Sequence, residues 1–253
     1  MALFVDGPAS TIDDLTDQDA GLLGVSQTTG INVSTKLRLA QEEIGTDLHL
    51  WLIRPRSMET LWGPTPKLDQ IVVTRSLKRW ETMHALALVY RDAYFSQLVD
   101  RYQAKWQEFA KLAAKARESL IASGLGMVND PLKQPQAPVL GSVTGPQAGG
   151  VFYASVSWVN GEGQESAASV TSSISVADGN LMTVTAMNAP GNATGFRVYA
   201  GPALNAMYLQ NDVLLTPGTT YTYVPGLVTQ GTLPGDGQKP DFTRPLVRTL
   251  LRG

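Results

Sequence analysis

A proline-rich joint divides this chain into two halves with different residue periodicity. The joint is the segment PLKQPQAP at residues 131–138. Residues 1–134 hold 15 of the 20 Lys and Arg residues and 16 of the 22 Asp and Glu residues, with apolar residues at helical spacing. After the joint, Gly, Thr, Ser and Val dominate, and apolar residues alternate. A repeat of 3.6 residues indicates helix and a repeat of two indicates strand, so the sequence predicts an all-α domain followed in series by an all-β domain.

Composition excludes several functional classes. The chain has no cysteine, which rules out thiolate catalysis, disulfides and cysteine-ligated zinc. Its net charge of -2 provides no basic excess for sequence-independent nucleic-acid binding. Only 17% of residues are charged, against about 25% in an average globular protein, which leaves uncharged surface for other proteins to cover. The sequence therefore favours an assembly component.

Localisation is predicted from two absent signals. The first residues, MALFVDGPAST, lack the basic and apolar regions of a signal peptide. No run approaches the roughly 20 apolar residues that span a bilayer. We therefore expect synthesis in the cytoplasm, no export by a signal peptide and no membrane partner.

The first 55 residues contain signals for two helices. Ser10 is expected to cap a short helix whose first turns are rich in Asp. The stretch from Gly21 to Gly30 is predicted to be a loop. Asn32 or Ser34 is expected to cap a longer helix that ends by Pro55. Its apolar stripe is Leu37, Ala40, Ile44, Leu48 and Trp51.

The main helical body follows a connection at residues 58–67. Residues 69–95 are apolar on nearly every side, so this helix should be buried on several faces, within its domain or between subunits. Residues 97–123 carry one clear apolar stripe, and Gly124 should end that helix. The stripe is Leu98, Tyr102, Trp106, Phe109, Ala113, Ala116 and Leu120.

The second of these helices also has a basic face, which two glutamates, Glu108 and Glu118, interrupt. Such a face is usually solvated. It could instead line a channel for DNA, and we expect solvent or salt bridges between subunits rather than the channel. The basic residues are Arg101, Lys105, Lys111 and Lys115.

Short strand-like runs separated by Gly and Pro turns recur after the joint. Six such runs can be delimited, and about seven short strands at this spacing are typical of an antiparallel β-sandwich. We expect its core to contain Phe152, Val156, Trp158, Val184, Phe196 and Val198. The runs are residues 151–159, 169–176, 181–186, 195–200, 206–209 and 219–224.

No arrangement of residues predicts catalysis. The two histidines, His49 and His84, lie in separate predicted helices, and no metalloprotease, nucleotide-binding or acyl-transfer motif is present. Glu162 and Glu165 share a loop, but residues three apart in a turn seldom flank a scissile bond, so a solvated hairpin is expected. We predict no catalytic residues, no metal site and no cofactor.

The C-terminal segment, Asp241 to Gly253, has helical spacing of basic and apolar residues. Pro245 fits only the first turn of such a helix. A helix this short is marginal alone, so it should order against a partner or against its own bundle. Its basic edge is Arg244, Arg248 and Arg252, and its apolar stripe is Leu246, Val247, Leu250 and Leu251.

Both halves resemble parts of tailed-bacteriophage virion proteins. The segments YASVSWVNGEGQESAAS and GFRVYAG resemble the fibronectin type III or immunoglobulin-like modules appended to many such proteins. The segments STIDDLTDQDAGLL, KLRLAQEEI and DRYQAKWQEF look like the helical head-to-tail connector, or adaptor, proteins. A β module between the bundle and the C-terminal tail is an addition to the minimal connector.

The resemblance implies a structural virion protein of the neck, assembled in the host cytoplasm. Connectors form a homo-oligomeric ring, commonly of twelve copies, that joins the portal protein to a tail or tail-completion protein. Genomic DNA passes through the ring without sequence-specific binding. By this resemblance, residues 1–134 are the connector domain, residues 135–236 the β-sandwich, and residues 237–253 a C-terminal arm that grips the portal.

Two other functions compete with the connector. The β-sandwich could make the protein a virion or surface adhesin that binds carbohydrate or a host surface, although no exposed aromatic platform is evident. The third candidate, an enzyme with an accessory sandwich, lacks a polar constellation for catalysis.

Overall fold

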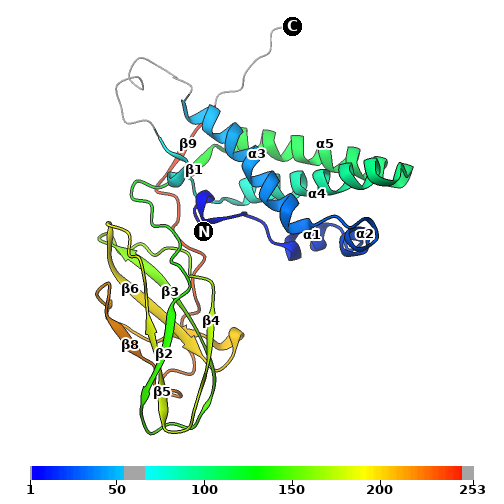
Figure 1. Ribbon diagram of the computed structural model, residues 1–253. Coiled ribbons are helices and arrows are strands. Elements are labelled where there is room, and N and C mark those ends of the chain that lie inside the picture. Colours follow the sequence, from blue (N-terminus) through cyan, green and yellow to red (C-terminus); the bar gives the residue numbers. More distant parts are fainter. Residues whose placement is uncertain (1, 54–65, 247–253) are drawn as a thin grey trace, which may run out of the picture. The chain divides into compact units, whose positions relative to one another are not determined.

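The structure, a computed structural model, describes residues 2–53 and 66–246. It confirms the predicted fold class: an N-terminal helical region is followed by an antiparallel β-sandwich (Figure 1). None of the helices in the described ranges is long and apolar enough to cross a bilayer.

Two short helices at the start of the chain differ from prediction. The first, α1 (Ile12–Gln18), is capped by Thr11 rather than Ser10: the Thr11 hydroxyl accepts a hydrogen bond from the Asp14 amide, and the Asp14 carboxylate accepts one from the Thr11 amide. The predicted loop from Gly21 to Gly30 is wrong, because it contains α2 (Leu22–Thr29). Polar Ser and Thr side chains obscured this helix, whose hydroxyls bond backbone carbonyls within the turn.

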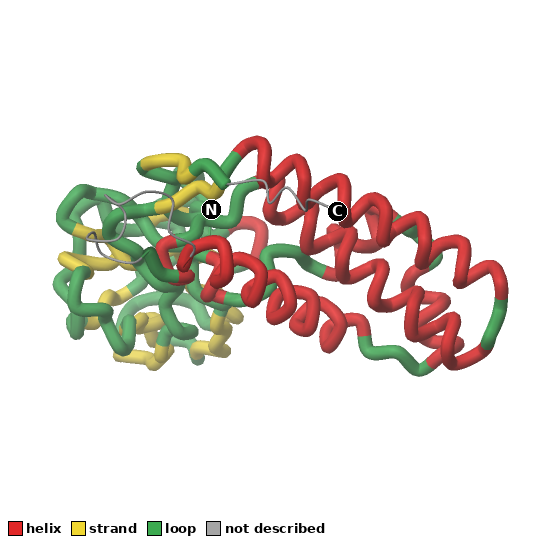
Figure 2. Tube along the Cα trace, turned by 90° about the horizontal axis from the view of Figure 1, so that it is seen from above, coloured by secondary structure: helices red, strands yellow, loops and turns green. Residues whose placement is uncertain are grey.

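Three long helices run side by side and form the body of the domain (Figures 1 and 2). They are α3 (Val33–Ile53), α4 (Arg75–Gln97) and α5 (Asp100–Ser123), and a 3-10 turn, Leu68–Gln70, precedes α4. The predicted cap of α3 is confirmed, since the Asn32 side chain accepts a hydrogen bond from the Thr35 amide. The predicted connection at residues 58–67 lies mostly outside the described residues.

Most apolar residues of α4 are covered within its own domain, and Phe95, near its end, is exposed. Helix α5 packs along one side of α4, α3 along another, and α1 and α2 along a third. The alternative that α4 needs a neighbouring subunit to bury its apolar faces is therefore not required. Its fully buried residues include Leu77, Ala85, Leu86, Val89 and Tyr90.

A small sheet closes the helical domain after α5. Strand β1 (Leu125–Met127) pairs antiparallel with β9 (Phe242–Arg244) near the end of the chain. On its other edge β1 bonds residues 70–72, through Val72 N to Gly126 O at 3.0 Å and Val128 N to Gln70 O at 2.9 Å. Gly124, which ends α5 as predicted, has φ 80°, and a Cβ there would lie 2.7 Å from the Arg244 carbonyl oxygen. Only glycine permits this close approach.

The β-sandwich is inserted in the helical domain rather than appended in series. One compact unit contains residues 4–128 and 240–246, and the other contains residues 129–239 together with Ala2 and Leu3. These bounds differ from the predicted 1–134, 135–236 and 237–253. The reason is the pairing of β1 with β9, which returns the chain to the helical domain.

The sandwich has two antiparallel sheets, with strand orders β2-β5-β8 and β4-β3-β6-β7. Their inner faces bury the predicted core residues, and Trp158 and Phe196 meet edge to face at 6.0 Å between ring centroids. The strands are β2 (Val139–Thr144), β3 (Gly150–Asn160), β4 (Ser172–Val176), β5 (Asn180–Thr185), β6 (Ala193–Gly201), β7 (Tyr208–Leu209) and β8 (Thr220–Thr222).

Two segments at the ends of the insertion belong to the sandwich. Leu132 is fully buried in its core. The buried Gln238 side chain accepts a hydrogen bond from the Leu132 amide at 2.6 Å and donates one to the Asp130 carbonyl at 2.9 Å. The entering and leaving segments are thus joined before the chain returns to the helical domain.

The insertion predicts that the helical domain survives removal of the sandwich. Replacing residues 129–240 by Asn-Gly, which favours a two-residue hairpin between β1 and β9, should leave a folded domain. Truncation after residue 134 retains the same helices but removes β9, and should lower the unfolding midpoint. Circular dichroism with thermal unfolding checks both variants. If the hairpin variant unfolds at a lower temperature than the protein truncated after residue 134, the conclusion that the sandwich is an insertion is wrong.

The sandwich fragment should depend on its outer segments. We expect residues 129–239 to fold alone and to be more stable than residues 135–236 by at least about 2 kcal/mol, the lower end of the cost of removing a buried leucine side chain. Urea unfolding followed by tryptophan fluorescence measures the difference. Equal stability would show that Leu132 and Gln238 are dispensable.

Candidate interaction surfaces of the helical domain

An exposed apolar cluster lies at the turn between α4 and α5. The rings of Tyr94, Phe95 and Trp106 contact one another with centroids 5.4–6.2 Å apart; Tyr94 and Trp106 are stacked, and Phe95 is tilted against both. Phe95 is 62% exposed and Leu98 is 71% exposed. We call these four residues the hairpin tip. Clusters of large exposed apolar side chains mark interaction sites more often than isolated ones do.

Leu98 also has a strained backbone conformation, in addition to its exposed side chain. It ends α4 with φ 52° and ψ 39°, in the left-handed region, and its amide bonds the Tyr94 carbonyl. Glycine or asparagine usually occupies this position, because the left-handed region costs other residues about 1–2 kcal/mol. A leucine here is strained and leaves its side chain in solvent. Local strain of this kind is concentrated at functional sites.

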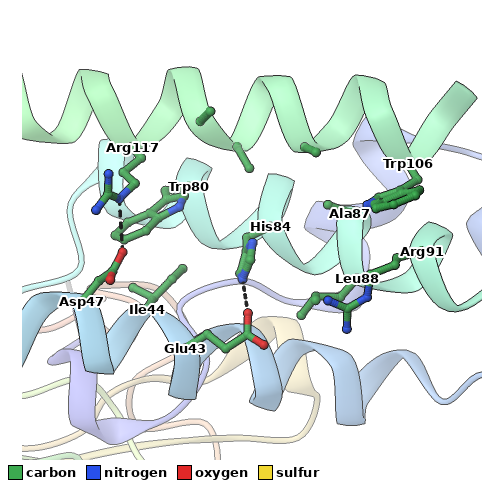
Figure 3. Close-up of a pocket in the computed structure, with 13 residues that line it drawn as sticks. Glu43, Ile44, Asp47, Trp80, His84, Ala87, Leu88, Arg91, Trp106 and Arg117 are labelled. Carbon is green, nitrogen blue, oxygen red and sulfur yellow. Dashed lines mark hydrogen bonds and ion pairs between the residues drawn. The ribbon is translucent and has the colours of Figure 1, made fainter. Parts of the chain in front are cut away.

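A groove runs along α4 between α3 and α5 (Figure 3). Its volume is about 450 Å³. Its floor includes Trp80, Ala87 and Leu88, and its α5 wall is a stripe of small residues, Ala110 and Ala114. Trp106 lies at one end of the groove, so the groove and the hairpin tip are continuous.

Paired charges line the groove. Glu43 Oε2 and His84 Nε2 point toward one another at 2.5 Å, and the Arg117 Nε donates to Asp47 Oδ2 at 3.1 Å (Figure 3). The Arg117 guanidinium also lies 5.0 Å from the ring centroid of Trp51. The predicted non-catalytic role of His84 remains a prediction. In the described ranges, no three His, Asp or Glu side chains are arranged to hold a metal ion.

The predicted basic face of α5 divides into two parts. Lys105 contacts its own chain, with Nζ 2.5 Å from the Asp19 carboxylate, and Arg101 lies over the Tyr102 ring. Lys111 and Lys115 are exposed. Lys105 thus forms an ion pair within its own chain, beside the α1–α2 connection, while its side chain stays 44% exposed. Whether the basic face meets solvent, another subunit or a channel remains a prediction.

Asp19 organises that contact. Burial alone would raise the pKa of its carboxyl, but hydrogen bonds from Lys105, Tyr90 and the Gly21 amide lower it below the ordinary value. A charged carboxylate therefore ties α1 and α2 to both α4 and α5. The reciprocal effect, after burial, raises the pKa of the Tyr90 hydroxyl.

The sequence did not identify a buried acid in α4. Glu81 is fully buried, and one of its carboxylate oxygens accepts a hydrogen bond from the Ser10 amide at 3.2 Å. Ser10 also bonds the Lys78 carbonyl and the Thr82 hydroxyl. Burial raises the pKa of Glu81 to about 7. The hydrogen bonds between Ser10 and these α4 residues hold the N-terminal segment against α4.

The two glutamates of the loop after β3 have different surroundings. Glu162 is exposed, whereas the Glu165 carboxylate accepts hydrogen bonds from Ser157, from Arg197 at 2.7 Å and from Tyr199 at 2.5 Å. The expectation of a solvated hairpin is wrong for Glu165. Its bonds fasten the segment after β3 over the outer face of β3 and β6.

The structure describes only part of the predicted C-terminal site. Arg244 lies in strand β9, and its guanidinium donates to the Leu52 carbonyl at 3.2 Å. Leu246 packs against the helical core. The predicted helix therefore cannot include Arg244. The remaining residues, Val247, Arg248, Leu250, Leu251 and Arg252, lie outside the described residues.

Comparisons of this chain with protein-family models, with curated proteins and with solved structures found no match.

The raised pKa of Glu81 predicts that its contribution to the free energy of unfolding falls as pH rises. Its pKa is about 7 in the fold, against an ordinary 4.5, so the folded state holds an extra proton between these values. At 1.36 kcal/mol per pKa unit, ionisation costs up to about 3 kcal/mol. Stability from this group is full below pH 4.5 and is lost as pH rises through 7.

Glu81→Gln should remove this component. We expect the variant to be more stable than the unchanged protein at pH 8 and nearly equal to it at pH 5. Thermal unfolding across this range measures the difference, and comparison of the two proteins cancels the other titrating groups. A constant difference would show that Glu81 does not titrate there.

Proposed function

We propose that the protein is a non-enzymatic structural component that assembles through its helical domain, as a head-to-tail connector of a tailed-phage virion. The observation that carries this proposal is the hairpin tip. Its strained Leu98 and exposed Phe95 cost free energy in the isolated chain, and a contact with another protein would offset that cost by burying them.

In the proposed assembly, helical domains pack side by side in a closed ring. Cyclic closure requires each copy to offer two complementary patches, and the hairpin tip supplies one. The resemblance to connectors suggests twelve copies, with the portal protein on one side and a tail or tail-completion protein on the other. DNA would pass without sequence-specific contacts, and the basic residues free to face it would be Lys111 and Lys115.

The insertion suits the sandwich to an accessory role. Its two ends meet the helical domain at adjacent strands, β1 and β9. A module inserted between these two strands interrupts none of the helices proposed to assemble. We propose that the sandwich is such an addition, carried by each copy.

One observation supports an adhesin as a second candidate. The outer face of the sheet β2-β5-β8 is uncharged and includes Val139, Val143, Thr183, Thr185 and Thr220. The hydroxyls of Thr185 and Thr220 lie 2.9 Å apart. An uncharged face of this kind could contact a host surface or carbohydrate. Binding of the monomer to a glycan array would favour this candidate.

The connector predicts a ring that depends on the hairpin tip. Electron microscopy and light scattering of the full chain, with and without its portal, should show closed rings. Leu98→Asn should abolish or strongly reduce them, while thermal stability of the monomer stays equal or rises, because asparagine tolerates the left-handed region. A monomer under both conditions would contradict the connector.

A matched control separates the tip from general loss of apolar surface. Leu204 lies in the sandwich and is 62% exposed, and Leu204→Asn should leave assembly unchanged. If both leucine variants assemble like the unchanged protein, the hairpin tip is not the interface.

A further inference from the structure

Strand β2 lies at the edge of its sheet and lacks the features that usually prevent an edge from pairing with another chain. It ends the sheet β2-β5-β8, and with six residues it is longer than the other edge strands of the sandwich, β4, β7 and β8. Natural edge strands are often very short, or they carry a charge, a proline or a bulge. Strand β2 (VLGSVT) has none of these, and no charged residue occurs from residue 134 to residue 161.

The hydrogen bonds around β2 show which of its backbone groups face outward. In an antiparallel pair, successive residues turn their N–H and C=O groups alternately toward the partner strand and away from it. Directly after β2, the Gly145 amide donates to the Gly179 carbonyl at 2.8 Å, on the side of β5. The odd-numbered residues of β2 therefore face β5. The even-numbered residues, Leu140, Ser142 and Thr144, turn their N–H and C=O groups toward the free edge.

A contact at the start of β2 agrees with this direction and limits the free edge. The Pro138 carbonyl accepts a hydrogen bond at 3.0 Å from the hydroxyl of Ser172, which belongs to β4 of the other sheet and not to β5. Proline has no N–H to donate. A strand that pairs with β2 therefore bonds the residues after Pro138. In the part of the chain that the structure describes, no strand pairs with that edge.

The exposed side chains of β2 match a second copy of the same strand. Val139 and Val143 are 56% and 45% exposed, and each lies two residues from Gly141. If two β2 strands pair antiparallel about a two-fold axis at Gly141, Val139 of each copy lies opposite Val143 of the other. These valines form non-hydrogen-bonded pairs, in which side chains come closest. Leu140 and Ser142 then lie opposite one another and exchange their hydrogen bonds.

The absence of charge also favours a second copy over another protein. A two-fold axis places each side chain near its own counterpart, so a charged strand would bring like charges together. The three strands of this sheet contain no charged residue. The edge offers a foreign strand no charge that would select it, whereas β2 itself supplies the matching valines.

We propose that β2 pairs with β2 of a second copy in this register and joins the two sandwiches in one continuous sheet, β8-β5-β2-β2-β5-β8. This pairing gives the inserted module a role of its own, which is to tie two copies of the chain together. It does not depend on the connector function, because that function is assigned to the helical domain.

A mixing experiment with the full-length chain tests the pairing. The chain has no cysteine, so Val139→Cys and Val143→Cys each carry a single thiol. One of the two is tagged to change its size, and the mixture is mildly oxidised. Opposed non-hydrogen-bonded residues have Cα atoms about 4.5 Å apart, which a disulfide can span. The mixed dimer should form faster than either homodimer, because each thiol lies four residues from its own counterpart in this register.

Val151 provides the matched control. It is a valine of β3, in the other sheet, and it is 50% exposed. A mixture of Val139→Cys with Val151→Cys measures the rate of random collision. We expect the Val139→Cys and Val143→Cys mixture to react about tenfold faster, because pairing raises the local concentration of the second thiol. Equal rates would overturn the proposal, including the case in which β2 accepts only a strand of another protein.

Proline substitutions test the register. The N–H groups of Ser142 and Thr144 both face the free edge, so proline at either position leaves the bonds to β5 in place. In the proposed register Ser142 bonds Leu140 of the second copy, whereas Thr144 lies opposite Pro138, whose carbonyl is already bonded.

Ser142→Pro, introduced into both cysteine variants, should therefore slow the mixed disulfide about tenfold, as expected for the loss of two hydrogen bonds. Thr144→Pro should leave the rate unchanged. Thermal unfolding checks that both proline variants are folded. If Thr144→Pro slows the reaction as much as Ser142→Pro does, or if neither slows it, the proposed pairing is wrong.

Discussion

The pairing of β1 with β9 is the constraint on which the rest of the structure depends. Strand β1 is held on one edge by residues 70–72 and on the other by β9. This small sheet connects the end of α5, the start of α4 and the returning chain. Because both crossings to the sandwich leave from it, the helical domain and the inserted module can each have a complete core. Because Gly124 approaches the Arg244 carbonyl closely, a side chain added at position 124 would disturb this pairing.

Buried polar groups determine how the N-terminal segment covers α4. Glu81 bonds Ser10, and Asp19 joins Tyr90 and Lys105. With these contacts, α1 and α2 cover one side of α4 while α3 and α5 cover the others. The exposed apolar surface of the described helical domain includes the hairpin tip and the groove, whereas the sequence suggested a face of α4. We therefore look for intermolecular contacts on apolar surface that the domain's own helices leave exposed.

The two surfaces have different physical properties. The hairpin tip is exposed and includes Leu98, whose backbone conformation is strained. The groove has charge pairs that satisfy one another and a wall of small residues. They meet at Trp106, which belongs to both.

The sequence by itself determined the local structure: apolar stripes predicted α3, α4 and α5, and alternation predicted the strands whose inward residues form the sandwich core. It failed for α2, where polar side chains bond the backbone, and for β1, β2 and β9, which are short or mostly exposed. Only the tertiary structure decided that the sandwich is an insertion, that Lys105 pairs with Asp19, that Glu81 is buried and that Leu98 is left-handed. These features join residues far apart in the chain or arise from packing, and periodicity reports only which face of an element is apolar, not what covers it.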